Sequence, residues 1–476
     1  MKRDVENYGH CRKLLTLHEL LLKLVYIMSS NQNFYEELRR LVAFPSISSD
    51  PAYAGSVRDC ALYLKKRLER LPAEVKLIKT NGHPLIVARI KRNPSWPTVA
   101  IYNHYDVQPI AEPDKWKSAP FVLKSEKGRY YGRGAADDKG NLLAALLAVE
   151  LALARGLALN FEFIYEGEEE SGSPNFKAGI ARARGFLNPD SIIIADGGWV
   201  SKAQPTLIYG IRGLLYMHWN MKTGKKASHS GETGGAARNP LEELMSAAVK
   251  CHDAKTGKIL IPGVYKKVKR PSKDELQSWD RIALGVDEFM KMHELKTLRV
   301  KNKSALLKTI WARPTFEVHG CVGGYMKKDG RMTLVPSEGQ LLVSMRLVPE
   351  QKPEEILKQV RSYVAKLNPD IKISVTSQSQ PYVGHLQSAE VNAATQALEK
   401  TFRLPVIKAR IGGSIGAVAD LHATFENARM FVMSFSLPEY GIHGPNEYFE
   451  HRMAMGGIKA FYDYFEIISK AEAARR

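Results

Sequence analysis

Short apolar runs that alternate with helical patterns limit the fold of this chain more than any other feature. From Phe34 onward, strand-like runs are predicted at Thr98–Asn103, Phe161–Tyr165, Ser191–Ala195 and Met430–Ser434. A helix rich in leucine and alanine is predicted over Lys139–Arg155, where Gly156 is placed to end it. This order of elements is typical of an α/β fold in which a largely parallel sheet lies between helices.

The middle of the chain has a different pattern. A helical segment at Pro353–Leu367 is surrounded by predicted strands near Leu214–Met221, Thr315–His319, Gln340–Arg346 and Ile371–Thr376. A chain of 476 residues with 44% hydrophobic content is too long for one simple core, so two domains are expected. We predict an N-terminal extension at 1–30, a first domain at 31–211 and 387–476, and an inserted smaller α+β domain at 212–386.

The N-terminal segment is leucine-rich but polar residues interrupt it. Leu14–Ile27 contains His18, Glu19 and Lys23, and it is too short for a membrane span. No small-residue cleavage site follows, so we interpret it as an amphipathic extension, with a poor signal peptide as the alternative. The four cysteines form no C-x-x-C pair, which favours a reduced, cytoplasmic setting, and no membrane association is predicted.

The net charge of +19 raises the question of nucleic acid. Lysine and arginine are spread along the chain, and no zinc-finger spacing, aromatic RNA-binding motif or helix-turn-helix accompanies them. We therefore predict a solvated basic surface that attracts anionic substrates, with no nucleic-acid partner. A non-catalytic basic binding protein would be favoured if the acidic and histidine residues described next were incomplete.

Acidic residues and histidines follow the predicted strands or lie in the loops just beyond them. Open α/β sheets place ligand sites there. The clusters are His104-Tyr105-Asp106, Asp137-Asp138, Glu168-Glu169-Glu170, Asp196 and His443. Taken singly, each has a structural explanation, such as a helix N-cap for an aspartate or a solvated loop for the glutamates. Together they supply the oxygen and imidazole ligands that suit two zinc or manganese ions.

The motifs H-Y-D-V-Q-P, G-R-G-A-A-D-D-K-G, E-E-S-G and H-G-P-N-E stand in this order. Read together, they resemble the co-catalytic metallopeptidase family that includes carnosine dipeptidases, acetylornithine deacetylase, desuccinylases and glutamate carboxypeptidases. The resemblance covers nearly the whole chain after about Met28 and is nearest to the dipeptidase branch. It implies two divalent ions, with zinc expected and manganese or cobalt as alternatives. The implied ligands are His104, Asp137, Glu170, Asp196 and His443, with Asp137 bridging both ions and joined to Asp138 by a cis peptide.

The resemblance also assigns roles to residues outside the metal ligands. Asp106 supports His104, and Glu169 is the catalytic base when the acidic loop is aligned on Ser171-Gly172. His229 is expected to reach the neighbouring subunit's site and to stabilise the developing oxyanion. Arg346 is expected to hold the substrate carboxylate in a pocket whose other expected members are Gly412, Gly413, Ser414 and His385. Arg410-Ile411 departs from the pattern, because dipeptidase-like relatives often carry an acidic residue there.

The function implied is metal-dependent hydrolysis of an amide bond next to a free carboxylate, in dipeptides or short peptides, by a homodimer. A deacylase acting on N-acyl amino acids needs the same metal centre and is the nearest alternative.

Overall fold

The computed structural model describes residues 33–326 and 330–474. The predicted N-terminal extension, 1–30, lies outside the described residues. Among the helices of the described part, none combines the length and the apolar character that a membrane crossing requires.

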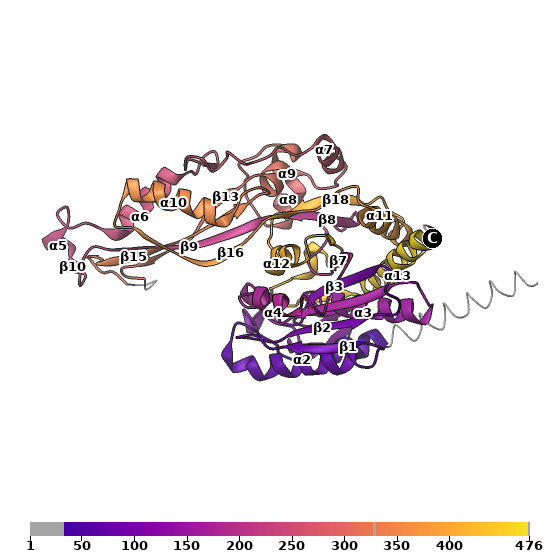
Figure 1. Cartoon of the computed structure of the whole chain (residues 1–476). Helices are drawn as coiled ribbons and strands as arrows, with labels where there is room; N and C mark the ends of the chain where they lie inside the picture. The colour runs from indigo at the N-terminus through magenta and orange to yellow at the C-terminus, as the bar shows by residue number, and fades with distance from the viewer. Residues whose placement is uncertain (1–32, 327–329, 475–476) are drawn as a thin grey trace, which may run out of the picture.

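A nine-stranded sheet forms the centre of the larger part of the molecule (Figure 1). Its strands are β1 (Glu74–Ile78), β2 (Leu85–Ile90), β3 (Thr98–His104), β6 (Asn160–Glu166), β7 (Ser191–Ile194), β8 (Thr206–Ile211), β17 (Tyr382–Val383), β18 (Ile407–Ile411) and β19 (Arg429–Val432). The adjacent strands β6, β3, β7 and β19 run parallel. β6 and β7 are buried at every position, as expected for strands covered on both faces. The four strands predicted from apolar runs are confirmed.

Helices cover both faces of this sheet. One face carries α2 (Ala54–Leu68), α3 (Lys139–Ala154), α11 (Ala389–Phe402) and α13 (His451–Ala473), and the other carries α4 (Phe176–Ala183) and α12 (Gly416–Thr424). α3 contacts both β3 and α13 and is buried along most of its length, because it lies between the sheet and that outer helix. This layering explains its apolar composition on all sides. The predicted α/β class is confirmed.

A second, antiparallel sheet extends from the larger part as an arm (Figure 1). It has the order β13 (Thr315–Gly323), β15 (Glu338–Leu347), β9 (Gly213–Lys222), β16 (Lys372–Ser379), with α6 (Pro240–Cys251) and α10 (Pro353–Leu367) packed on it. The predicted strands and helix of this region are confirmed. β17, at Tyr382–Val383, pairs with β8 in the larger sheet, although the inserted domain was predicted to extend to residue 386. The domain boundaries stay a prediction.

Three helices between β12 and β13 pack on the edge of the larger sheet. They are α7 (Lys273–Asp280), α8 (Val286–Met292) and α9 (Lys303–Ala312). Trp279 and Trp311 share a core with Ile407 and Ala409 of β18. The remaining elements are short: α5 (Ser230–Thr233), β4 (Lys124–Glu126), β5 (Arg129–Tyr131), β10 (Ser228–His229), β11 (His252–Asp253), β12 (Lys258–Ile259), β14 (Leu334–Val335), β20 (Tyr448–Glu450), and the 3-10 helices η1 (Pro51–Tyr53), η2 (Pro113–Lys115), η3 (Glu169–Ser171) and η4 (Pro438–Tyr440).

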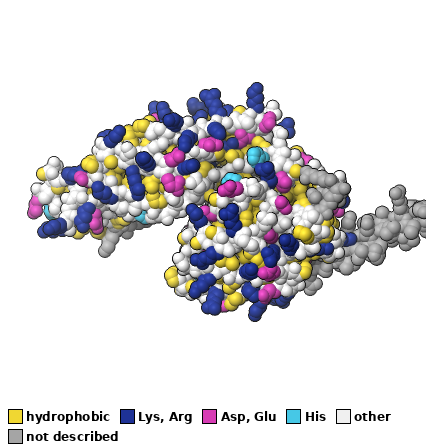
Figure 2. Space-filling view, in the orientation of Figure 1, with side chains coloured by type: hydrophobic (Ala, Val, Ile, Leu, Met, Phe, Trp, Pro, Cys, Tyr) yellow, Lys and Arg dark blue, Asp and Glu magenta, His cyan; other side chains and the backbone are white. Residues whose placement is uncertain are grey.

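Charged side chains are distributed over both parts. Figure 2 shows lysine and arginine scattered across the visible face with aspartate and glutamate between them. The same view shows the arm overhanging a hollow beside the larger part.

Candidate metal centre

His104 ends β3, at the centre of the larger sheet. The neighbouring strands β6 and β7 run parallel to β3, so the loops that follow all three strands meet at one edge. The buried ring of His104 places its Nε2 2.9 Å from Oδ1 of Asp137 and 3.9 Å from Oδ1 of Asp196. The structure thus brings together residues that lie far apart in the sequence.

His443 completes the cluster from the loop before β20. Its Nε2 lies 3.0 Å from Oδ2 of Asp137 and 3.3 Å from Oε2 of Glu170. Asp137 therefore stands between the two histidines, one on each carboxylate oxygen. The structure brings together all five residues predicted as ligands: His104, Asp137, Glu170, Asp196 and His443.

Asp138 follows Asp137 across a cis peptide bond. Two groups of three residues each place one potential ligand atom per residue within 4.8 Å of the others. The first group is His104, Asp138 and Asp196, and the second is His104, Asp137 and Glu170. Oδ2 of Asp138, however, accepts a hydrogen bond from Nδ2 of Asn103 at 2.7 Å. Asn103 was not predicted as part of the site, although it directly precedes His104.

Asp106 connects the histidine to the acidic loop. Its Oδ1 lies 3.4 Å from Nδ1 of His104, and its backbone oxygen lies 3.1 Å from the same nitrogen. The two carboxylate oxygens accept hydrogen bonds from the backbone N–H groups of Glu169 at 3.2 Å and Glu170 at 3.0 Å. A carboxylate in this position fixes the ring and the loop together.

Four glutamates, one at the end of β6 and three in the acidic loop that follows, have different surroundings. Oε2 of Glu166 accepts from the hydroxyl of Tyr102 at 2.7 Å, and Oε1 of Glu168 accepts from the backbone N–H of His83 at 3.1 Å. Oε2 of Glu170 accepts from Nε2 of Gln108 at 2.8 Å. Within the described residues, the carboxylate of Glu169 has no hydrogen-bond partner. Glu169 thus differs from the other three glutamates, each of which accepts a hydrogen bond.

Buried acids crowd this site without enough positive charge. Burial, reinforced by the negative charge of Asp137 and Glu170, raises the pKa of Asp196 to about 7. Burial and the charge of Asp196 also raise the pKa of Glu169 well above its ordinary value. Divalent cations remove this repulsion. The donor set of imidazole and carboxylate groups fits two such ions.

A buried ion pair holds two of the predicted ligands in place. Glu447 accepts from Nη1 of Arg133 at 2.7 Å and from the backbone N–H groups of Gly134, Ala136 and Asp137 at 3.1, 2.9 and 3.1 Å. Nη2 of Arg133 donates to the backbone oxygen of His443 at 3.1 Å. Both side chains are almost completely buried. This pair joins the Asp137 loop to the His443 loop and was not predicted.

Arg346, in β15, contacts the turn before α12 that carries three of the other residues predicted for the carboxylate pocket. Nη1 of Arg346 donates to Oγ of Ser414 at 2.8 Å, and that hydroxyl donates to the backbone oxygen of Arg212 at 2.5 Å. Gly412 lies against Arg212, whereas an added Cβ at Gly413 would meet nothing within 4 Å. His385 is exposed, and its backbone oxygen accepts from the backbone N–H of Ser388; its pocket role stays a prediction.

Arg410 has a structural partner. Its guanidinium contacts the carboxylate of Glu275 in α7, which also accepts from the hydroxyl of Tyr209 at 2.7 Å. The positive charge of Arg410, which stands where an acidic residue was expected, is thus neutralised by Glu275.

His229 lies in β10, on the arm, and Figure 1 places β10 at the far end of the arm from β3 and β7. The structure does not bring it to the metal cluster of its own chain. Its Nδ1 accepts from the backbone N–H of Gly231 at 2.9 Å. The exposed Nε2 therefore carries the proton and is a donor.

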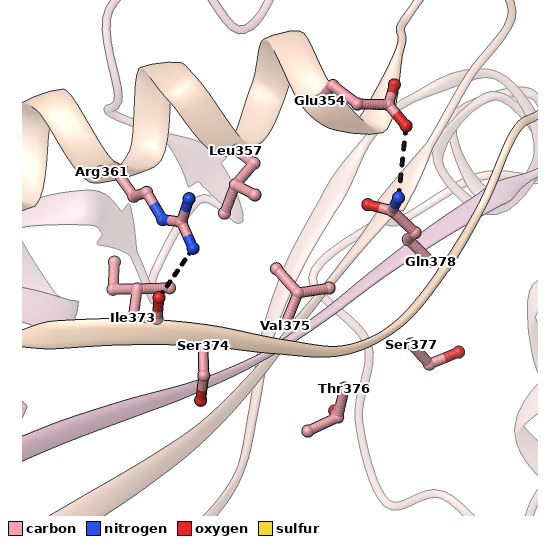
Figure 3. A pocket seen from close by; sticks show the side chains of 9 residues that line it. All are labelled: Glu354, Leu357, Arg361, Ile373, Ser374, Val375, Thr376, Ser377 and Gln378. Atoms are coloured by element: carbon pink, nitrogen blue, oxygen red, sulfur yellow. Dashed lines mark hydrogen bonds between the residues drawn. The ribbon is translucent and has the colours of Figure 1, made fainter.

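A separate groove of about 700 Å³ runs between α10 and β16 (Figure 3). Leu357, Ile373 and Val375 line its apolar part, and Nη2 of Arg361 donates to the backbone oxygen of Ile373 at 2.9 Å. Residues of the metal cluster do not line this groove.

Residues 100–467 match the model of the peptidase family M20/M25/M40. The chain is 28% identical over 481 residues to a Beta-Ala-His dipeptidase from Mus musculus, covering 96% of this chain and 97% of that protein. It is 27% identical to the dipeptidase Dug1p from Saccharomyces cerevisiae, with a TM-score of 0.83 and coverage of 94% and 97%. An M20 family metallo-carboxypeptidase from Sulfolobus solfataricus is 29% identical, with a TM-score of 0.85 and coverage of 91% and 98%.

Proposed function

Because the chain belongs to the peptidase family M20/M25/M40, we propose that it is a dimetal hydrolase that cleaves the amide bond of dipeptides or short peptides with a free carboxylate. The observation that carries this proposal is the convergence of His104, Asp137 and Glu170 beside the unpaired carboxylate of Glu169. The dipeptidase named among the relatives supports the choice of short substrates.

The residues divide the reaction between them. His104, Asp137, Glu170, Asp196 and His443 would hold two divalent ions, with zinc as the proposed metal. Such ions supply Lewis-acid activation of water and of the scissile carbonyl. Glu169 takes the proton from the attacking water and delivers it to the leaving amine. Arg346 binds the free carboxylate through its guanidinium.

Substitution within the acidic loop tests the base. Glu169→Gln should retain the metal and lose activity by about 10² to 10⁴-fold, because general acid–base catalysis contributes that much. Glu168→Gln is the matched control, because its carboxylate contacts the backbone of His83 and not the reacting atoms. Both variants are assayed on a dipeptide panel with zinc, manganese and cobalt. Preferential hydrolysis of N-acetyl amino acids would instead favour the deacylase.

We further propose a homodimer that assembles through the arm. His229 is exposed and lies away from the metal cluster of its own chain, so its donor is available to a partner's site. Large apolar side chains are exposed on α6 and β13: Met245 at 46%, Val249 at 70%, Val318 at 49% and Val322 at 43%. An exposed apolar surface of this kind favours burial against a second copy.

Subunit exchange tests this assembly. Mixing inactive His229→Ala and Glu169→Gln chains should restore activity, because one site of each mixed dimer combines an intact Glu169 with an intact His229. Two-fold symmetry predicts up to about half of the wild-type sites in each mixed dimer. Mixed dimers that form and stay inactive would refute the role of His229, and a fully active monomer in sedimentation would refute the dimer.

A further inference from the structure

Two arginines, Arg346 and Arg212, contact Ser414 in the predicted carboxylate pocket. Oγ of Ser414 accepts from Nη1 of Arg346 and donates to the backbone oxygen of Arg212. Within the described residues, neither guanidinium forms an ion pair with a carboxylate. Burial and the charge of Arg346 lower the pKa of Arg212 to about 10, so both side chains are positively charged at neutral pH.

Arg212 is held by backbone oxygens. Its Nε donates to the oxygen of Gly412 at 2.9 Å, and its Nη1 donates to the oxygen of Arg313 at 3.4 Å. Arg313 is the C-cap of α9, so the guanidinium lies at the negative end of that helix dipole. These dipoles stabilise the buried cation but leave its full positive charge in the pocket.

Arg212 also packs closely against Gly412. An added Cβ at residue 412 would lie 2.8 Å from Nη2 of Arg212 and 3.0 Å from the backbone oxygen of Ile310. Arg212 therefore packs directly against the Gly412–Ser414 turn, and Ser414 in turn contacts Arg346.

From this geometry we infer that Arg212 is a positioning residue for recognition of the substrate carboxylate. It supports the Gly412–Ser414 turn that orients Arg346, and it adds a second positive charge that forms no ion pair among the described residues, although Glu317 is near enough to act on it electrostatically. The anion that completes this arrangement is the terminal carboxylate of a short peptide. This inference rests on the proposed function, and it assigns a residue that sequence reasoning treated only as the start of the insert.

Steady-state kinetics with a carboxylate-dependent readout test the role. For alanyl-alanine, Arg212→Met should raise KM by about ten- to hundredfold, the worth of a hydrogen bond to a charged group, with kcat changed by less than about threefold. For alanyl-alaninamide, which lacks the carboxylate, the same variant should change KM less than about twofold. Arg212→Lys should recover part of the loss. Arg313→Met is the matched control, because it removes a neighbouring exposed cation and keeps the backbone oxygen.

Calorimetry separates this inference from the proposed function. Binding of alanyl-alanine and its amide is measured on the metal-loaded full-length Glu169→Gln enzyme, with and without Arg212→Met. If the wild type hydrolyses no peptide, the proposed function fails, and the wild type itself is used for the binding measurement. Loss of the preference for carboxylate over amide in the Arg212→Met protein supports the inference. An unchanged preference, or equal losses for both ligands, overturns it.

Discussion

Replacement of Glu447 by glutamine tests how the metal ligands are held. The carboxylate accepts one hydrogen bond from the guanidinium of Arg133 and three from backbone N–H groups of the loop that carries Asp137. Glutamine has one carbonyl oxygen to accept them, and its amide group would face donors. Arg133 would also be left as a buried, unpaired cation, because its side chain is only 1% exposed.

The expected loss can be worked from these contacts. Breaking a buried ion pair by removing one partner costs about 3–5 kcal/mol of unfolding free energy. Because the Asp137 and His443 loops lose their common support, metal affinity should also fall by about 10- to 100-fold. Arg133→Met should lower the free energy of unfolding less than Glu447→Gln does, because three backbone N–H groups would still donate hydrogen bonds to the remaining carboxylate.

Urea unfolding of metal-free protein measures the first quantity, and competition with a chelator measures the second. Glu450→Gln is the control, because its carboxylate pairs with exposed Arg452 and should contribute less than about 1 kcal/mol. The reasoning is wrong if Glu447→Gln loses less than about 1 kcal/mol and keeps its metal affinity, or if Arg133→Met is the more damaging change.

Two further predictions concern the metal cluster and a buried acid away from it. Asp137→Ala should lose both activity and bound metal, because this carboxylate stands between His104 and His443; full metal content in elemental analysis with normal turnover would contradict the assignment. Burial raises the pKa of Glu162 to about 7, so the folded state binds a proton that the unfolded state releases near its ordinary value, and this stabilisation is lost as pH rises from about 4.5 through about 7. Glu162→Gln should remove up to about 3 kcal/mol of that pH dependence, at 1.36 kcal/mol per pKa unit. The unfolding free energy of both proteins is measured in urea between pH 5 and pH 8, and the same change with pH in both would contradict the prediction.

The buried strands β6 and β7 could be predicted from sequence because their environment imposes a continuous apolar run, whereas β8, which is also buried throughout, was not predicted. β7 is Ser-Ile-Ile-Ile and is buried throughout, so its composition alone marks it. β1 could not be found this way, because it is an edge strand with a mixed exposure pattern. The strand β17 has two residues, which is too short for a hydrophobic pattern to predict it, and it is defined by its pairing with β8.

The candidate ligands could be predicted because the four motifs resemble those of the metallopeptidase family; the ends of the strands alone do not distinguish Glu170 from Glu168 or Glu169. The supporting contacts could not. Arg133 and Glu447 are 314 residues apart, and each alone reads as an ordinary surface charge. Arg410 was a puzzling departure in the sequence, and only the position of α7 shows that Glu275 neutralises it.

The two halves of the proposed substrate site belong to different sheets. His104 ends a strand of the larger sheet, whereas Arg346 lies in β15 of the arm, so the angle between the sheets sets the distance from metal cluster to carboxylate pocket. The chain passes between the sheets at Arg212-Gly213, where an added Cβ on Gly213 would lie 2.5 Å from the backbone oxygen of Ser379 and 2.7 Å from the nitrogen of Pro381. The outgoing and returning segments therefore touch at this crossing, which leaves no room for a side chain. Because Arg212 stands at the crossing and also holds the Gly412 turn, the same residue links the angle between the sheets to the geometry of the pocket. A peptide whose carboxylate binds at Arg346 would thus present to the metal cluster a bond at a set distance from its C-terminus, so this geometry would select which bond is cleaved.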